Sequence, residues 1–249
     1  MDLVPVAAAL AAALFLGGVI KGAIGFGLPL ISVPLMALAV DIRIALALMT
    51  IPIFASNIRQ AIRGGMIGEI LRRFWWLLLA LALGFVLGGV LLVRLDADYL
   101  LAVVGLAVIV FVLSSLGGPP RALPRSLERP LGLAAGVVGG ILGALSTFFG
   151  PPIVMYLVAL QLPPRLLVAT IGAIWLWGGI LLIGTYTSAE ILTWQLALLS
   201  VLCIAPVLVG QMAGEWLRER INQRLFRAAT LSVLFVIGVS MLRHALPAW

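Results

Sequence analysis

The sequence predicts an all-α polytopic membrane protein, because it is strongly hydrophobic, poor in charge and divided into long apolar runs. Of its 249 residues, 63% are hydrophobic and 10% are charged, whereas soluble domains carry about 25% charged residues. The mean hydropathy is +1.24. At about 20 residues for each spanning helix, the length leaves room for about eight to ten crossings. This composition argues against a soluble enzyme, a nucleic-acid binder and a secreted disulfide scaffold.

The net charge of +7 indicates membrane orientation rather than nucleic-acid binding, because most arginines lie in short loops between apolar runs. The single cysteine, Cys203, rules out an intrachain disulfide and any multi-cysteine metal site. Together with the single His244 and the lack of an acid cluster inside a run, it offers no catalytic or metal-binding set. We therefore expect no enzyme activity and no cofactor. Asp2 precedes the first run without a basic segment, so we expect no cleaved signal peptide.

The apolar runs fall into two halves within a single transmembrane domain, 1–249. Residues 1–116 form the first predicted repeat, 117–130 a hydrophilic connecting loop rich in proline and arginine, and 131–249 the second repeat. The first half has runs at about 5–40, 44–62, 72–93 and 98–116. The second half has runs at about 131–162, 166–186, 191–213 and 225–243.

Three matched features, in the same order, support a duplication. The first run of each half is interrupted, by GFGLP at 25–29 and by FFGPP at 148–152. Arg43 and Arg165, 122 positions apart, then open the second run of each half. Near the end of each half, a glycine pair separated by three residues is followed by an arginine: Gly84, Gly88 and Arg94 match Gly210, Gly214 and Arg220. Such small-residue pairs are typical of close helix packing.

The distribution of basic residues predicts that the two halves are inverted. If each interrupted run made one crossing, giving eight helices, the basic loops would be split between both sides. If each is a helix pair that returns to its starting side, twelve basic residues lie on one side and three, Arg43, Arg94 and Arg243, on the other. The positive-inside rule favours the second path, with the central loop in the cytoplasm, which is the inverted repeat common in secondary transporters. Whether each pair spans fully or forms a re-entrant hairpin stays open, although the second arm, about 28–40, is short.

The two interruptions are the predicted substrate-binding segments. Irregular backbone inside a membrane is tolerated only where it is buried or lines a cavity. Glycine permits the turn, and Pro29 and Pro152 suit the first position of the helix that follows. The N-terminus of such a helix favours an anion. The candidate residues are Gly22, Gly25, Phe26, Gly27 and Pro29 in the first half, and Phe149, Gly150 and Pro152 in the second. The alternative is that both are ordinary kinks.

Polar side chains beside these interruptions complete the candidate site. Lys21 lies four residues before Gly25 in an otherwise apolar segment, and a lysine at that depth normally faces a cavity or a partner. An anionic substrate would neutralise it; the alternative is a lysine that reaches the headgroups. Ser146 and Thr147 either donate hydrogen bonds to an oxyanion or bond back to helix carbonyls. Asn57, in the second run, either lines the pathway or bonds to another helix.

These motifs give the chain a family resemblance that covers essentially its whole length. The stretch GGVIKGAIGFGLP, the related FFGPP of the second half and the runs around a basic central loop resemble the sulfite exporter TauE/SafE permeases. The resemblance implies an inner-membrane, multi-pass permease of small anions, chiefly sulfur-containing ones such as sulfite and organosulfonates. It assigns the glycine-rich motifs to Gly22, Gly25, Gly27 and, more loosely, Gly150. Phe148 and Phe149 depart from it, because glycines are common there.

The predicted function is therefore transport of a small anion, most simply export, by alternating access between two inverted halves. The expected partners are the anion and the lipid bilayer. The alternatives are a passive anion channel and a non-transporting membrane scaffold subunit. Whether the chain acts alone or as a homo-oligomer is left open by the sequence.

Overall fold

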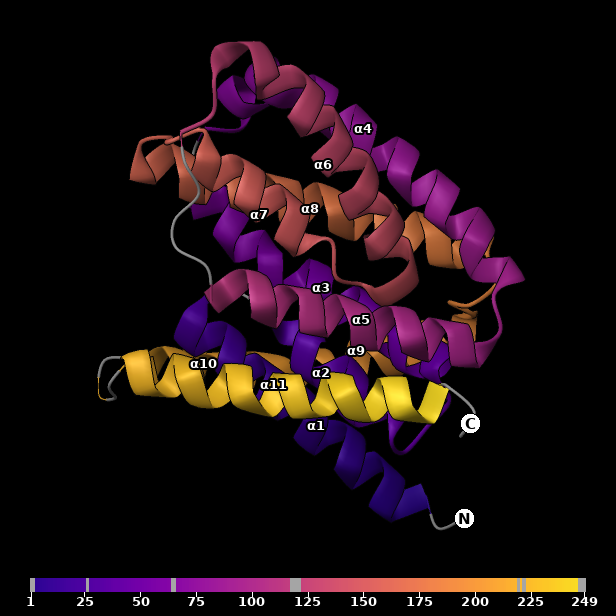
Figure 1. Ribbon diagram of the computed structural model, residues 1–249. Coiled ribbons are helices and arrows are strands. Elements are labelled where there is room, and N and C mark those ends of the chain that lie inside the picture. The colour runs from indigo at the N-terminus through magenta and orange to yellow at the C-terminus, as the bar shows by residue number, and fades with distance from the viewer. Residues whose placement is uncertain are drawn as a thin grey trace. The chain divides into compact units, whose positions relative to one another are not determined.

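The structure is a computed structural model that describes residues 3–25, 27–63, 66–116, 122–218, 220 and 223–245. All regular secondary structure in these residues is helical (Figure 1), which confirms the predicted all-α class. The helices are α1 (Leu3–Ile24), α2 (Leu28–Ala37), α3 (Ile42–Arg63), α4 (Ile67–Arg94), α5 (Ala97–Leu116), α6 (Arg125–Ser146), α7 (Gly150–Ala159), α8 (Pro164–Ser188), α9 (Trp194–Leu202), α10 (Ile204–Arg218) and α11 (Gln223–Ala245).

Seven stretches within the described residues are long and apolar enough to cross a membrane. They are α1, α4, α5, α6, α8, the continuous segment Trp194–Arg218, and α11 from Ala228. The shorter apolar helices are α2, α7 and the Ile42–Ile58 part of α3. The chain is therefore a multi-pass membrane protein, as the hydrophobicity predicted.

The predicted connecting loop 117–130 is shorter than expected, because α6 already begins at Arg125. Arginine, leucine and glutamate are good helix formers, so the polar composition of 125–130 marks the water-facing start of a helix rather than a loop. A second difference is the break at Cys203 between α9 and α10. Pro206 lacks the N–H that would bond to the carbonyl of Leu202 and its ring crowds that carbonyl.

The chain divides into two compact units, and each draws helices from both halves of the sequence. Unit 1 is Met1–Ile53, Leu95–Leu113 and Ile191–Trp249; unit 2 is Phe54–Arg94 and Ser114–Glu190. Unit 1 therefore contains α1 and α2 with α5, α9, α10, α11 and most of α3. Unit 2 contains α4, α6, α7 and α8 with the end of α3.

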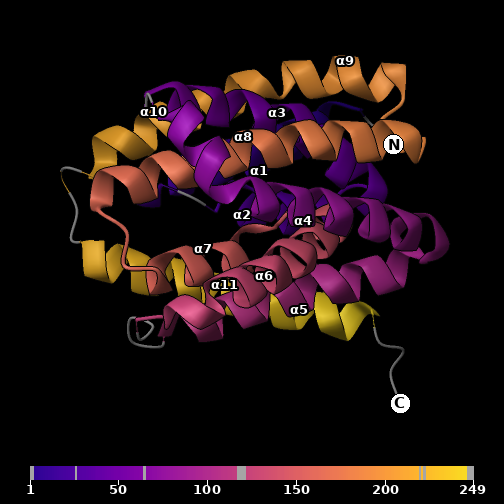
Figure 2. The same cartoon turned by 90° about the horizontal axis from the view of Figure 1, so that it is seen from above.

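Each interrupted run folds back on itself as an antiparallel helical hairpin. In unit 1 the Ser32 hydroxyl of α2 donates a hydrogen bond to the Ala13 carbonyl of α1 (3.0 Å). In unit 2, Gly143 and Gly139 of α6 pack against Phe149 and Ile153 at the start of α7, and Figure 2 shows these two arms side by side. With 10 residues each, α2 and α7 rise only about 15 Å. This is about half the thickness of the hydrocarbon core.

The first arm of each hairpin packs closely along a glycine pair of the opposite half. In unit 1, a Cβ atom on Gly210 of α10 would lie 2.2 Å from the Phe15 carbonyl oxygen of α1. In unit 2, a Cβ atom on Gly84 of α4 would lie 2.3 Å from the Val137 carbonyl oxygen of α6. The close contacts continue one turn later at Gly214 and Gly88. The glycine pairs matched in the sequence thus make the same kind of helix contact in both units, and the packing role predicted for them is confirmed.

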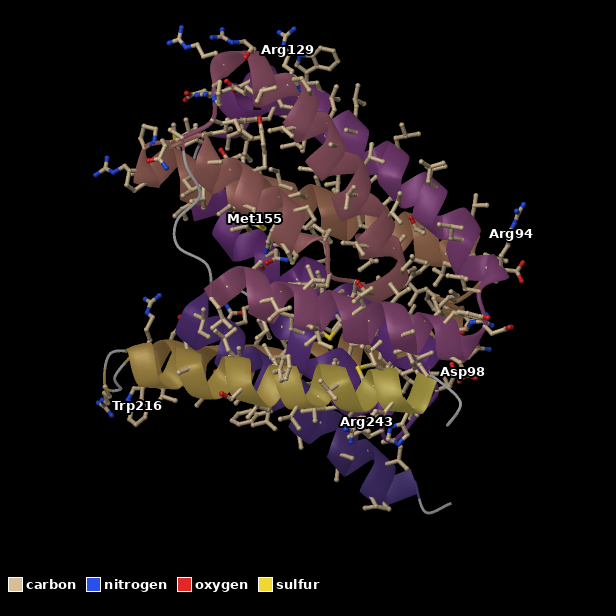
Figure 3. The ribbon with its side chains drawn as sticks, in the orientation of Figure 1. Arg94, Asp98, Arg129, Met155, Trp216 and Arg243 are labelled. Atoms are coloured by element: carbon tan, nitrogen blue, oxygen red, sulfur yellow. The ribbon has the colours of Figure 1, made fainter. Side chains whose placement is uncertain are left out.

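The helix directions agree with hairpins that return to their starting side. The indole nitrogen of Trp177 donates to the Leu78 carbonyl (3.1 Å) and Gly89 faces Thr185, so α4 and α8 run parallel. An eight-crossing path would make them antiparallel. In unit 2 the starts of α4, α6 and α8 therefore share one end, which collects five described arginines: Arg72, Arg73, Arg125, Arg129 and Arg165. Arg94 lies at the other end of α4 (Figure 3). These directions are consistent with the predicted inverted repeat.

Candidate functional site

The first predicted binding segment is a helix break built from left-handed backbone. Gly25 and Gly27 have φ angles of 94° and 97°, values that glycine adopts at little cost. The Gly25 amide donates to the Lys21 carbonyl (2.7 Å) and closes the last turn of α1. Helix α2 then begins at Leu28, so Pro29 occupies its second position and not the predicted first one. Proline is tolerated there because the first four amides have no intrahelical partner. Phe26 lies outside the described residues.

Lys21 is buried in the last turn of α1, one turn before this break. Its side chain is 5% exposed, and it is the basic residue of that turn. A charged lysine at this depth is costly, by about 2.5 kcal/mol or more. It therefore has to face a partner, a cavity or a ligand. The carbonyls at the end of α1 carry a partial negative charge and the amides at the start of α2 a partial positive one, so the break is strongly polar.

The second predicted segment, in unit 2, also contains left-handed backbone, but at a threonine instead of a glycine. Thr147 has a φ angle of 60°, and it directly follows the last residue of α6, as Gly25 directly follows the last residue of α1. A left-handed threonine is strained, because its branched side chain crowds the backbone. The Ser146 hydroxyl donates to the Leu142 carbonyl (2.6 Å), and the Thr147 hydroxyl donates to the Ser146 carbonyl. Both hydroxyl groups thus bond to backbone carbonyls, which is the second of the two alternatives for these residues.

Aromatic rings surround the start of α7. The Phe149 side chain is 4% exposed and makes edge contacts with Phe85 and Trp175, at centroid distances of 5.7 Å and 5.2 Å. Helix α7 begins at Gly150, and Pro152 is its third residue, two positions later than predicted. Because residues 151 and 152 are both proline, two of the first four amides of α7 are missing. The second break is therefore a poorer source of anion-binding donors than the first.

The remaining predicted residues have clear positions. Asn57 of α3 belongs to unit 2 and is buried, with 2% of its side chain exposed. Gly22 packs against α10, because a Cβ atom there would lie 2.1 Å from the Gln211 carbonyl oxygen. The structure brings Lys21, Gly22, Gly25, Gly27 and Pro29 together in unit 1. It brings Asn57, Ser146, Thr147, Phe149, Gly150 and Pro152 into unit 2.

One polar residue beside the first hairpin was missed by the sequence reasoning. Gln211 lies on α10 opposite Gly22, and its side-chain oxygen is buried without a hydrogen-bond partner in the part of the chain that the structure describes. Its amide nitrogen donates to Glu215 (3.4 Å). The available signal was a glutamine inside an apolar run, directly after Gly210. Among the described residues, no three His, Cys, Asp or Glu side chains form a group that would hold a metal ion.

The helical fold, the two helix breaks and the buried Lys21 beside the first of them define a polytopic membrane protein. This construction is typical of a membrane transporter. The sequence model of the family described as sulfite exporter TauE/SafE matches residues 10–241. The chain belongs to this family, which confirms the resemblance and makes it a member of a family of membrane transporters rather than enzymes. Comparisons with curated proteins and with solved structures gave no match.

Proposed function

We propose that this protein moves small anions, namely sulfur oxyanions or organosulfonates such as sulfite, across the cell inner membrane. Transport proceeds by alternating access between the two inverted halves. The family gives the transporter class. The observation that carries the choice of an anion is the burial of Lys21 beside the glycine break between α1 and α2.

In this proposal, the anion binds at this break to the positive charge of Lys21 and to backbone amide groups of α2. Leu28 and Leu30 supply amide groups in the first turn of α2, where intrahelical partners are lacking. These amides and the Lys21 ammonium suit a compact oxyanion, whose several oxygen atoms accept hydrogen bonds from different directions. The residues of unit 2, Asn57, Ser146, Thr147, Phe149, Gly150 and Pro152, have secondary roles in the proposal, because the hydroxyl protons of Ser146 and Thr147 already have acceptors.

Export is the favoured direction on energetic grounds. An inside-negative membrane potential contributes about 2.3 kcal/mol per elementary charge for each 100 mV towards expelling an anion. No further energy source is then needed to move a monovalent anion outwards against a moderate gradient. The proposal therefore includes no protein-borne proton relay.

The test is counterflow in liposomes that contain the purified full chain. Vesicles loaded with unlabelled sulfite are diluted into radiolabelled sulfite, and parallel samples use sulfate, an organosulfonate or chloride. We expect saturable accumulation of label with sulfite or the organosulfonate. Uptake without counterflow would identify a passive anion channel, and no uptake of any anion would identify a scaffold. Either outcome contradicts the proposal.

Substitution of Lys21 tests the site itself. Loss of a charged hydrogen bond costs about 1.5–3 kcal/mol, so Lys21→Met is expected to weaken anion affinity about ten- to hundred-fold. Lys21→Arg, which keeps the charge, should retain most of it. The matched control is Arg94→Gln, which removes an exposed cation at the end of α4. If Lys21 only offsets the partial charge at the end of α1, the methionine variant will transport like the parent protein, and the proposed site will be wrong.

A further inference from the structure

A second polar site lies in unit 2 at the start of α6, whereas the break before α7 follows the other end of that helix. A pocket of about 310 Å³ is lined by Arg73 and Trp76 of α4 and by Arg125, Ser126, Glu128 and Arg129 of α6. We call it the arginine pocket. Its three arginines and one glutamate give it a formal charge of +2. Arg73 approaches Glu128 at 3.7 Å, while Arg125 and Arg129 are exposed.

Besides the arginines, the start of α6 offers hydrogen bonds to an oxyanion here. Helix α6 begins at Arg125 after Pro124, without a side-chain cap, so the positive end of a 22-residue helix borders the pocket. The hydroxyl of Tyr156, whose ring contacts Trp76 edge-on at 6.2 Å, is buried and has no hydrogen-bond partner within the described residues.

Gly132 permits this arrangement of rings. It lies one turn after Glu128, and a Cβ atom there would be 2.4 Å from the Trp76 ring and 2.8 Å from Tyr156 Cζ. The rings of Trp76 and Tyr156 therefore pack directly against the α6 backbone at Gly132. The Trp76 indole borders the arginine pocket, whereas the Tyr156 hydroxyl is buried.

The arginine pocket lies at the depth of lipid headgroups. On α4, residues 74–93 carry no charge and are bracketed by Arg73 and Arg94. Twenty residues of helix rise about 30 Å, which is the thickness of the hydrocarbon core. Figure 3 shows Arg129 and Arg94 at opposite ends of unit 2. Trp75, 58% exposed, has the place of an interfacial tryptophan.

Exposed apolar side chains follow the pocket residues along α4 and α6. Exposed aliphatic side chains continue along α4 and α6 from this end, namely Leu79, Leu83 and Val86 on α4 and Leu131 and Leu133 on α6. A phospholipid bound with its phosphate in the pocket would lay its acyl chains on these side chains. A free oxyanion would make no use of them. The apolar surface therefore favours a lipid as the occupant.

From this juxtaposition we propose that the arginine pocket binds the phosphate group of an anionic phospholipid. Arg125 and Arg129 hold the phosphate oxygens, since the guanidinium fork matches their geometry. The first amides of α6 are the further donors. This inference does not depend on which anion the protein transports.

Native mass spectrometry of the purified full chain tests the proposal. Binding of phosphatidylglycerol is compared with that of phosphatidylcholine with the same acyl chains, for the parent and for the double variant Arg125→Gln/Arg129→Gln. We expect phosphatidylglycerol to bind about tenfold more tightly than phosphatidylcholine, and the double variant to lose about tenfold or more of that affinity. Arg94→Gln, on the same unit, should bind like the parent.

Two results would overturn the inference. One is equal phosphatidylglycerol binding by the parent and the double variant. The other is displacement of the lipid by inorganic phosphate or sulfite at millimolar concentration, which would make the pocket a site for free oxyanions. The arginines are exposed, so the double variant should melt like the parent in lipid-free detergent, and Arg129→Gln alone provides a milder variant.

Discussion

The contact between α4 and α6 in unit 2 gives the sharpest stability prediction. Gly84→Ala places a Cβ atom 2.3 Å from the Val137 carbonyl oxygen and 2.8 Å from the Gly140 Cα atom. Both neighbours are backbone atoms of α6, so no side-chain rotation relieves the overlap. Ordinary van der Waals contact begins near 3.4 Å, and the difference from 2.3 Å is 1.1 Å. The two helices must therefore separate by about this amount along the glycine pair.

The cost of that separation follows from lost packing. Overpacking of a tightly packed contact costs about 1–3 kcal/mol, and helix association in membranes depends heavily on such small-residue packing. Gly84→Ala is therefore expected to lower the melting temperature by several degrees. Gly210→Ala should do the same, because its Cβ atom would lie 2.2 Å from the Phe15 carbonyl oxygen in unit 1.

Gly184→Ala on α8 is the matched control, because a Cβ atom there meets no atom within 4 Å. Alanine is the better helix former by about 0.5–1 kcal/mol, so this variant should be as stable as the parent or slightly more so. The assay is thermal unfolding of the purified proteins in one detergent, followed by tryptophan fluorescence. Equal melting temperatures for Gly84→Ala and Gly184→Ala would refute the reasoning.

Two further substitutions test local features by the same unfolding measurement. Gly25→Ala should destabilise the folded protein by about 1 kcal/mol despite the open space around Gly25, because the φ of 94° is unfavourable for any residue with a Cβ atom. An unchanged melting temperature would contradict this. Ser200→Ala should cost about 0.6–1.7 kcal/mol, because the Ser200 hydroxyl donates to the Leu48 carbonyl (2.9 Å), whose usual helical donor is missing at Pro52. Ser188→Ala is the control and should have no effect, because Ser188 is exposed and its hydroxyl bonds to Thr185 within its own turn.

The hairpins were predictable because glycine and proline act locally. The sequences GFGLP and FFGPP contain residues that interrupt a helix whatever surrounds them, and the structure breaks both runs there. The charge distribution likewise indicated that each run returns to its starting side, since arginine location relates to membrane side. The parallel directions of α4 and α8 agree with it.

Other features depended on contacts between distant segments. The sequence indicated that Gly84 and Gly210 serve packing, but not that Gly84 meets Val137 and Gly210 meets Phe15. The polar stretch before residue 131 looked like a loop because of its composition. Its helical start at Arg125 brings Arg125 and Arg129 beside Arg73, which is more than fifty residues away in the chain.

The sequence by itself determined the membrane class, the number of apolar runs, the two interruptions and the family, because hydrophobicity, helix-breaking residues and charge placement are properties of short segments. Only the tertiary structure decided which helices pair. It placed the first arm of each hairpin against a glycine-lined helix from the other half, engaged the Ser146 and Thr147 hydroxyls with carbonyls, and gathered three arginines at one end of α4 and α6. These outcomes depend on close contacts between segments that are far apart in the sequence. The local composition of a helix does not specify which other helix it packs against.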